Sequence, residues 1–210
     1  MADLAALTAA IEAGDRATAI AITREAVDEG MDPRAVLGAM TAAMEVIGAK
    51  FQCNEIYVPE MLISARAMKE ATAVLEPVLV KAGIRPEHTA VLGTIKGDLH
   101  DIGKNLVGMM WKGANIEVID LGTNVTAEKF VEAAKEHGAT IVGISALLTT
   151  TMVGMKDVVA AIRAANLGDV KVIVGGAPVT AEYAASIGAD GYAPDAATAV
   201  EVAKTAVGMA

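Results

Sequence analysis

The stretch that decides the fold is "TAVLGTIKGDLHDIGKNLVGMMWKG", residues 89–113. It opens with an apolar run, residues 89–95, and closes with a helical pattern, residues 101–113. The segment between them is short and contains glycine, aspartate and histidine. A short apolar strand followed by a helix is the repeating unit of a parallel sheet covered by helices. The stretch therefore predicts an α/β fold from residue 89 onward.

The same unit recurs to the end of the chain. The later strand and helix patterns are "IEVIDLG" with "TAEKFVEAAKEHG", "TIVGISAL" with "TMVGMKDVVAAIRAAN", "VKVIVGG" with "TAEYAASIG", and "ADGYAP" with "DAATAVEVAKTAVG". Together they predict a Rossmann-like, five-stranded parallel sheet with helices on both faces. In the flavodoxin-like strand order, ligands bind at the switch point between the first and third strands. The loops that start near residues 96, 146 and 175 are therefore expected to meet at one edge of the sheet.

Residues 1–83 contain helical patterns only, over 3–15, 15–30, 32–51 and 58–79. Asp32 is expected to cap the third helix with Pro33 in its first turn, and Pro59 opens the fourth. Helices joined by short turns predict a small four-helix bundle. The stretch "KAGIRPEH", residues 81–88, contains a glycine and a proline and predicts a connection. We therefore expect a helical domain over 1–83, a linker over 84–88 and the α/β domain over 89–210.

Composition excludes several classes of function. The 210-residue chain carries a net charge of −9 and a pI near 4.8, which disfavours nucleic-acid binding because phosphate contacts need clustered Lys and Arg. No stretch reaches the roughly 18 apolar residues of a membrane helix, and the N-terminus lacks the basic flank of a signal peptide. The single cysteine, Cys53, fits a reducing cytoplasm.

The loop after the first expected strand places Asp98 two residues before His100. It has neither the glycine spacing of a dinucleotide-binding loop nor the Gly-Lys-Ser/Thr of a phosphate-binding loop. A zinc site needs three or four ligands, and His88, His137 and Cys53 lie at no plausible spacing from His100. Two interpretations stay open: a helix cap beside a surface histidine, or a single axial metal ligand oriented by a carboxylate. One protein ligand is enough when a macrocycle supplies the remaining coordination.

The loops after the third and fourth expected strands are rich in hydroxyls and in glycine. The first contains Ser145 and Thr149–Thr151, and the second contains Gly175 and Gly176. Helix capping and a tight turn explain each loop separately. Their expected position at the same sheet edge as His100 also predicts a slot for a flat ligand group.

With these three loops, the chain resembles a cobalamin-binding protein. The Asp-x-His-x-x-Gly motif of that family stands here as Asp98-Leu99-His100-Asp101-Ile102-Gly103, its Ser-x-Leu as Ser145-Ala146-Leu147, and its Gly-Gly as Gly175-Gly176. The stretch "FQCNEIYVPEMLISARAMKEA", residues 51–71, resembles the helical cap that precedes this module in methionine synthase and in small corrinoid proteins of methyltransferase systems.

The resemblance implies a role for each matching residue. His100 would be the lower axial ligand of cobalt in place of the cofactor's own base, the base-off/His-on state. Asp98 and Thr151 would form a relay that tunes His100, and Asp98→Asn is expected to leave the fold intact. The implied contacts of the nucleotide tail are Ser145, Thr149, Gly175 and Gly176, and a side chain at either glycine is expected to fill the slot of the tail. The implied contacts of the upper corrin face are Phe51, Val58 and Met61, for which the bundle core is the alternative.

The resemblance also implies a function. The protein would carry a methyl group on the cobalt of cobalamin, methylcobalamin or a related corrinoid, as one subunit of a methyltransferase system rather than a complete enzyme. Its partners would be a substrate-specific corrinoid methyltransferase, a second methyltransferase acting on tetrahydrofolate or coenzyme M, and a reductive activase. A subunit of an adenosylcobalamin mutase, a cobalamin sensor and an α/β domain without cobalamin are the alternatives. The sequence does not select the methyl donor, which the resemblance leaves open among methanol, a methylamine, a betaine and a methoxylated aromatic.

Overall fold

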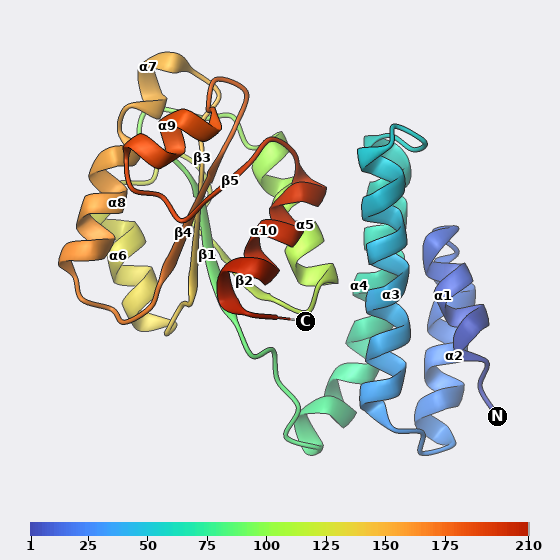
Figure 1. Cartoon of the computed structure of the whole chain (residues 1–210). Coiled ribbons are helices and arrows are strands. Elements are labelled where there is room, and N and C mark those ends of the chain that lie inside the picture. Colours follow the sequence, from blue (N-terminus) through green and yellow to red (C-terminus); the bar gives the residue numbers. More distant parts are fainter. Residues whose placement is uncertain (210) are drawn as a thin grey trace. The chain divides into compact units, whose positions relative to one another are not determined.

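The computed structural model describes residues 1–209 and divides the chain into two units (Figure 1). The helical unit contains Met1–Pro86 and Gly113–Asn115, and the sheet unit contains Glu87–Lys112 and residues 116–209. The predicted fold class, a helical N-terminal region followed by a five-stranded parallel sheet with helices, is confirmed.

The helical unit consists of α1 (Leu4–Glu12), α2 (Arg16–Asp28), α3 (Pro33–Gln52) and α4 (Val58–Lys81). Asp3, Asp15 and Asp32 accept backbone N–H groups in the first turns of α1, α2 and α3, which would otherwise have no partner there. At the start of α4, the Glu60 carboxylate accepts the N–H of Tyr57 at 3.0 Å. Aspartate caps therefore mark where α1, α2 and α3 begin, and the cap at Asp32 is the one predicted from the sequence.

The four helices pack around an apolar core. α1 packs against α3, and α2 packs against α4. Two polar contacts add to the apolar ones: Lys50 of α3 forms an ion pair with Glu12 of α1 at 3.0 Å, and the Ser64 hydroxyl of α4 donates to the Glu12 carbonyl at 3.0 Å. The largest fully buried side chains of this unit are Leu7, Ile11, Val36, Met40, Met61 and Leu75.

The sheet unit alternates strands with helices. Its strands are β1 (Thr89–Thr94), β2 (Glu117–Asp120), β3 (Ile141–Ser145), β4 (Lys171–Gly175) and β5 (Gly191–Ala193). All pairings are parallel, in the order β2-β1-β3-β4-β5, which is the predicted flavodoxin-like order. The helices between and after the strands are α5 (Ile102–Gly113), α6 (Ala127–Glu136), α7 (Thr149–Met152), α8 (Met155–Ala164), α9 (Ala181–Ser186) and α10 (Ala196–Val207).

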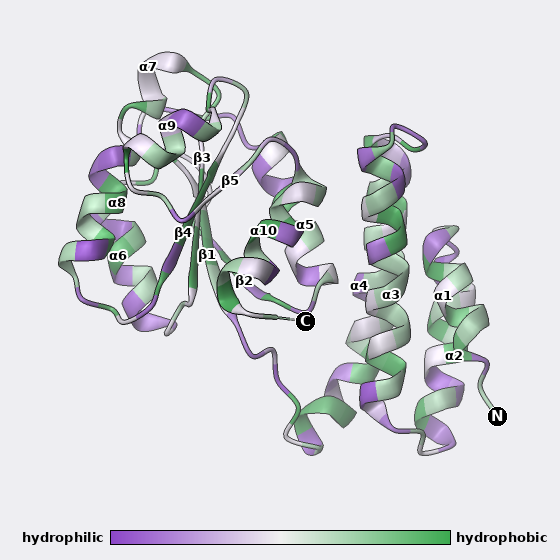
Figure 2. Ribbon diagram, in the orientation of Figure 1, coloured by the Kyte–Doolittle hydropathy of each residue, from purple (hydrophilic) through white to green (hydrophobic). Residues whose placement is uncertain are grey.

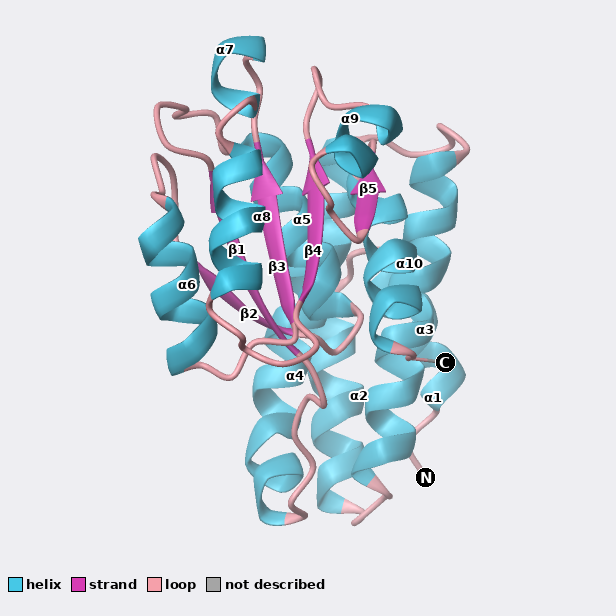
Figure 3. Ribbon diagram, turned by 60° about the vertical axis from the view of Figure 1, so that its left-hand side comes forward, coloured by secondary structure: helices cyan, strands magenta, loops and turns pink. Residues whose placement is uncertain are grey.

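Two apolar cores lie on opposite faces of the sheet (Figure 3). Phe130 of α6 and Val158 of α8 pack with Val142 on one face, together with residues of α9. Trp111 of α5 and Ala199 of α10 pack on the other face, where the Trp111 indole N–H donates to the Ala199 carbonyl at 2.9 Å. Because both faces are covered, the central strands are hydrophobic along most of their length, whereas the helices are hydrophobic on one side (Figure 2).

The carboxyl ends of the strands are aligned in register. Thr94 pairs with Ser145, Ser145 with Gly175, and Gly175 with Ala193. The loops that follow β1, β3 and β4 therefore leave the sheet at one edge. No helix within residues 1–209 is long and apolar enough to cross a membrane.

One helix differs from the prediction. The pattern over residues 151–166 was expected to form a single helix, but the structure has the short α7 (Thr149–Met152), a break at Val153 and Gly154, and then α8. At the break, the Gly154 N–H donates to the Thr151 carbonyl at 3.0 Å, three residues back instead of four. The separate turn positions the Thr151 side chain at the sheet edge rather than on the face of α8 that packs on the core.

Candidate functional site

The loop after β1 (residues 95–101, the His100 loop) begins with a tight turn. The Asp98 N–H donates to the Ile95 carbonyl at 3.1 Å, and Gly97 in the third position has a φ of +85°, which side chains with a Cβ rarely adopt. The Gly97 N–H donates to Asn124 Oδ1 at 2.8 Å, and the Asn124 N–H donates to the Asp98 carbonyl at 3.0 Å. The loop between β2 and α6 (residues 121–126, the β2–α6 loop) therefore holds the His100 loop through two hydrogen bonds.

The Asp98 carboxylate joins the His100 loop to the loop after β3. Its Oδ1 atom lies 2.7 Å from His100 Nδ1 and accepts the His100 backbone N–H at 3.1 Å. Its Oδ2 atom accepts the N–H groups of Leu147 and Leu148 at 2.8 and 3.3 Å, and lies 2.8 Å from the Thr151 hydroxyl. The side chain of Asp98 is 0% exposed. A buried acceptor at this position can therefore align both loops at once.

These contacts keep the Asp98 carboxyl ionised. Burial by itself would raise its pKa, but the N–H groups of Leu147 and His100, the His100 ring and the Thr151 hydroxyl lower it, and together they hold the pKa well below the ordinary range. An ionised carboxylate only accepts hydrogen bonds, so the proton between the two side chains belongs to His100 Nδ1. Asp98 thereby selects the histidine tautomer whose Nε2 atom carries a free lone pair.

His100 combines a fixed backbone with an accessible ring. The Thr94 hydroxyl donates to the His100 carbonyl at 2.9 Å, and the ring is held at Nδ1 by Asp98. The side chain is nevertheless 53% exposed, and its Nε2 atom makes no hydrogen bond within residues 1–209. An oriented imidazole whose second ring nitrogen has no partner among the described residues has the properties of a metal ligand.

Exposed apolar side chains surround His100. Leu99 and Ile102 are 72% and 75% exposed, and Leu147, Leu148 and Val153 are exposed on the loop and turn after β3. Within residues 87–209, the exposed large hydrophobic side chains all lie in residues 99–102 and 147–153. Such a surface beside an imidazole nitrogen without a partner fits a broad apolar ligand that brings its own metal.

Two of the predicted hydroxyl contacts have free polar groups. Ser145, at the end of β3, is partly exposed, and Thr149, at the start of α7, is exposed. Neither hydroxyl makes a hydrogen bond to another residue within 1–209, whereas Thr151 is already held by Asp98. Ser145 and Thr149 can therefore bond a ligand without breaking a contact inside the protein.

Gly175 and Gly176, at the end of β4, are required to be glycine for a physical reason other than the expected ligand slot. A Cβ at Gly176 would collide with the carbonyl oxygen of Ala146, and Gly176 has a φ of +124°. A Cβ at Gly175 would lie 2.7 Å from the carbonyl oxygen of Ala193 on β5. The protein's own backbone thus requires both glycines, which corrects the expectation that a side chain there would chiefly fill the ligand slot. A contact between these glycines and a ligand stays a prediction.

Gly103, unlike Gly175 and Gly176, has open space where a Cβ would lie. It lies exposed in the first turn of α5, and a Cβ built on it would meet nothing within 4 Å. Glycine in a helix costs roughly 1 kcal/mol relative to alanine, and no neighbour within the described residues compensates for that cost. Clearance for a ligand above the helix is a physical reason for this glycine. Its neighbour Asp101 is exposed and accepts the side-chain N–H of Asn105 at 3.1 Å.

The predicted upper-face residues belong to the helical unit. Phe51, near the end of α3, and Val58, at the start of α4, are partly buried. Met61 is 1% exposed and is part of the bundle core. A cofactor contact by any of the three stays a prediction.

Several residues that hold the site were not singled out by sequence reasoning. They are Thr94, Lys104, Asp120 and Asn124, which contact the His100 loop or the first turn of α5. Asn124 has a φ of +56°, a conformation that asparagine adopts more readily than most residues. The one signal in the sequence was Lys104, a charged residue in a helical pattern whose later positions, residues 106–111, contain no charge.

No group of three or more His, Cys, Asp or Glu side chains within residues 1–209 is arranged to hold a metal ion. The donor set is the single His100 nitrogen with apolar surroundings and unpaired hydroxyls nearby. These residues fit a cobalt corrinoid, in which the macrocycle supplies the equatorial nitrogens.

Comparison with known proteins agrees with this geometry. Residues 88–201 match a family model described as a B12 binding domain, and residues 4–76 match a second model with the same description. The fold and the site thus define a B12-binding protein in both units. A corrinoid protein of Desulfitobacterium hafniense is 43% identical over 207 residues, covering 96% of each chain. Monomethylamine corrinoid protein 2 of Methanosarcina acetivorans is 39% identical over 203 residues, covering 94% of each.

The chain belongs to this family of corrinoid proteins with B12 binding domains. Among solved structures, a chain of the methanol:cobalamin methyltransferase complex MtaBC from Methanosarcina barkeri matches with a TM-score of 0.86 and 27% identity, over 99% of this chain and 80% of that one. The predicted cofactor class and the predicted methyl-carrying corrinoid function in one-carbon metabolism are confirmed at this level.

Proposed function

We propose that this protein holds a corrinoid in the base-off/His-on state and carries a methyl group between two methyltransferases. The observation that carries the proposal is the buried Asp98 carboxylate on His100 Nδ1, at 2.7 Å, which leaves Nε2 free between two apolar loops. The match of residues 4–76 to a B12 binding domain model favours this function over a mutase subunit, because the mutase modules lack such a helical region. When bound, the corrinoid supplies a cobalt atom that accepts and releases the methyl group.

The residues of this chain orient the cofactor and tune it. His100 Nε2 would hold the cobalt of the corrinoid, and Asp98, through its contact with Nδ1, fixes the orientation of the imidazole ring. Thr151 donates to the other oxygen of Asp98 and so limits how strongly the carboxylate pulls on the Nδ1 proton. Leu99, Ile102 and the exposed leucines after β3 would pack against the bound corrinoid and exclude water from the surroundings of His100.

The nucleotide tail of the cofactor is proposed to enter beside β3. The unpaired hydroxyls of Ser145 and Thr149 support this position, because each has hydrogen-bonding capacity to spare. The open space at Gly103 supports passage of the tail over the first turn of α5. Leu147 has its N–H committed to Asp98, so we propose that it contacts the cofactor through its exposed side chain.

The partners are proposed to be a substrate-specific corrinoid methyltransferase, a second methyltransferase acting on tetrahydrofolate or coenzyme M, and a reductive activase. The MtaBC complex, in which such a chain occurs with a methanol:cobalamin methyltransferase, supports the first of these. The relatives are named for different methyl donors, so likeness of the carrier does not select the donor. A cytoplasmic location stays a prediction from the cysteine content.

The axial ligand is tested on the protein loaded with cobalamin in its Co(II) form. Electron paramagnetic resonance should show coupling to one axial nitrogen that changes when the histidines carry nitrogen-15. His100→Ala should lose the coupling, while His137→Ala, at the exposed end of α6, should keep it. A signal unaffected by the isotope would contradict ligation by histidine.

Methyl carriage is tested separately. The protein loaded with isotope-labelled methylcobalamin is incubated with a coenzyme M or tetrahydrofolate methyltransferase and its acceptor. Label should appear in the methylated acceptor at a rate that exceeds transfer from free methylcobalamin at the same concentration. An equal rate would mean that the protein stores the corrinoid rather than presenting it to a methyltransferase.

A further inference from the structure

Lys104 is a buried cation in the first turn of α5. Its side chain is 1% exposed, and its Nζ atom lies 2.6 Å from both carboxylate oxygens of Asp120 and 2.7 Å from Asn105 Oδ1. Asp120 ends β2 and is 44% exposed. Among the described residues, the charged side chains that are buried are Asp98 and Lys104, six positions apart and on either side of His100.

The contacts of Lys104 lead back to the His100 loop by two routes. On the first, Asn105 accepts from Lys104 and donates to Asp101, the residue after His100, at 3.1 Å. On the second, Asp120 Oδ1 accepts the N–H of Gly122 at 2.9 Å, which fixes the start of the β2–α6 loop.

The β2–α6 loop completes the second route. The Gly122 carbonyl accepts the N–H of Thr94, whose hydroxyl holds the His100 carbonyl. Asn124 holds Gly97 and Asp98. The chain of contacts therefore closes a ring that runs from α5 through the end of β2 and back to His100.

The two ends of this ion pair have unequal environments. An ammonium buried without its partner is costly, whereas a half-exposed carboxylate that loses its partner is solvated by water. Removing the charge of Lys104 should therefore be tolerated better than removing the charge of Asp120.

We propose that Lys104, through Asp120, is a positioning residue that holds the His100 loop in place for axial ligation. The proposal rests on the proposed function, because it concerns how His100 is presented to cobalt. It assigns no contact between Lys104 and the cofactor. Its prediction is that losing the Lys104–Asp120 pair loosens the His100 loop in the apoprotein and weakens the axial bond in the loaded protein.

The variant is Lys104→Met, which keeps the length and the buried apolar contacts of the side chain. Hydrogen exchange of the apoprotein should accelerate about tenfold or more at the amides of Gly97, Asn124 and Leu147, since their hydrogen bonds form the loop network. In protein loaded with Co(II) cobalamin, the fraction of paramagnetic signal that shows axial nitrogen coupling should fall below that of wild type.

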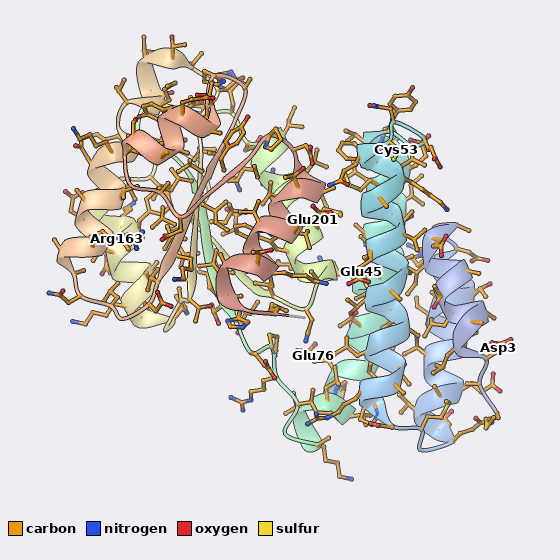
Figure 4. The ribbon with its side chains drawn as sticks, viewed as in Figure 1. Asp3, Glu45, Cys53, Glu76, Arg163 and Glu201 are labelled. Carbon is orange, nitrogen blue, oxygen red and sulfur yellow. The ribbon has the colours of Figure 1, made fainter. Side chains whose placement is uncertain are left out.

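Arg163→Met is the matched control. Arg163, labelled on α8 in Figure 4, forms an ion pair with Asp190 at 2.5 Å and donates to the Val170 carbonyl at 2.7 Å, away from the His100 loop. Its removal should lower thermal stability while leaving the exchange of Gly97 and Leu147 and the axial coupling unchanged. Any equal change in the two variants would show that the effect is general destabilisation and would overturn the proposal.

Asp120→Asn supplies a second arm. It should lower the melting temperature more than Lys104→Met does, because it leaves the buried ammonium without a counter-charge, and it should accelerate the same amides. Unchanged exchange in both variants would overturn the proposal even if stability falls. If wild-type protein itself lacks axial nitrogen coupling, the proposed function fails, while the exchange measurements on apoprotein still decide whether Lys104 orders the loop.

Discussion

The Thr151 hydroxyl lies 2.8 Å from Asp98 Oδ2, while His100 Nδ1 lies 2.7 Å from Asp98 Oδ1. One carboxylate therefore has one oxygen on the histidine and the other on the hydroxyl of a separate turn. The same hydroxyl lies 3.0 Å from the Leu148 carbonyl, and its one proton can serve only one acceptor. The shorter distance and the charge of Asp98 favour the carboxylate.

Thr151→Val removes this hydrogen bond and keeps the shape of the side chain. The carboxylate then accepts more strongly from the Nδ1 proton, so Nε2 becomes a stronger electron-pair donor to cobalt. A stronger axial ligand makes the reduction of cobalt to Co(I) harder. We expect the midpoint potential of the loaded protein to fall by roughly 10–40 mV. Spectroelectrochemical titration measures it, with Thr150→Val as the control. An equal or higher potential in Thr151→Val would remove Thr151 from the relay.

Gly103→Leu tests whether the open space at Gly103 is needed for cofactor binding, separately from any effect on folding. Since no atom lies within 4 Å of its Cβ position, the apoprotein should be as stable as wild type or more stable by about 1 kcal/mol. Its retention of cobalamin after gel filtration should nevertheless fall sharply. Gly38→Leu, at another open and exposed helical glycine on α3, should gain similar stability and retain cobalamin. Normal retention by Gly103→Leu would place the nucleotide tail elsewhere.

Gly176→Ala should fail in the apoprotein, before any cofactor is added. The new Cβ collides with the Ala146 carbonyl, so β3 and β4 must separate at their carboxyl ends. We expect a loss of about 3 kcal/mol or more in urea unfolding. Gly168→Ala, which also has a positive φ but open space around it, should lose only about 1 kcal/mol. Similar losses in the two variants would mean that backbone conformation, not the collision, requires Gly176.

Asp98→Asn should destabilise the apoprotein by about 2–4 kcal/mol at pH 7, because an amide nitrogen must face donors that the carboxylate oxygen now accepts. This replaces the expectation that the variant leaves the fold intact. The depressed pKa of Asp98 stabilises the fold above the unfolded-state pKa of about 4, and this stabilisation is lost as pH falls below that value.

The difference between wild type and Asp98→Asn should therefore be largest at neutral pH and shrink below about pH 4. Urea titrations of both proteins at several pH values measure it. Asp101→Asn is the control, because Asp101 is exposed and its change should cost little at any pH. A difference that does not vary with pH would mean that Asp98 is not ionised in the folded protein.

Short-range patterns in the chain were sufficient for the fold. Asp32 was predicted to cap a helix because a side-chain oxygen satisfies backbone N–H groups within the same turn, and in the structure Asp3 and Asp15 do the same. The apolar strands predict a parallel sheet because both faces must be buried. The break at Val153 was not predicted, because Val153 and Gly154 fit a helical pattern. The contact of Thr151 with Asp98 accounts for the separate turn α7, and that contact joins two loops that are distant in the sequence.

The site, like the fold, has some features that the sequence predicted and others that only the tertiary structure shows. The sequence by itself predicted that Asp98 could pair with His100, because residues two apart in a loop can share a hydrogen bond, and the resemblance carried by the three motifs implied the cofactor class. Only the tertiary structure decided that Asp98 is buried, that Thr151 and Leu147 complete its contacts, and that Gly176 serves the backbone of Ala146. Only the tertiary structure paired Lys104 of α5 with Asp120 of β2. These contacts join residues 16 to 53 positions apart, and their distances depend on the register of the parallel strands, which no local pattern encodes.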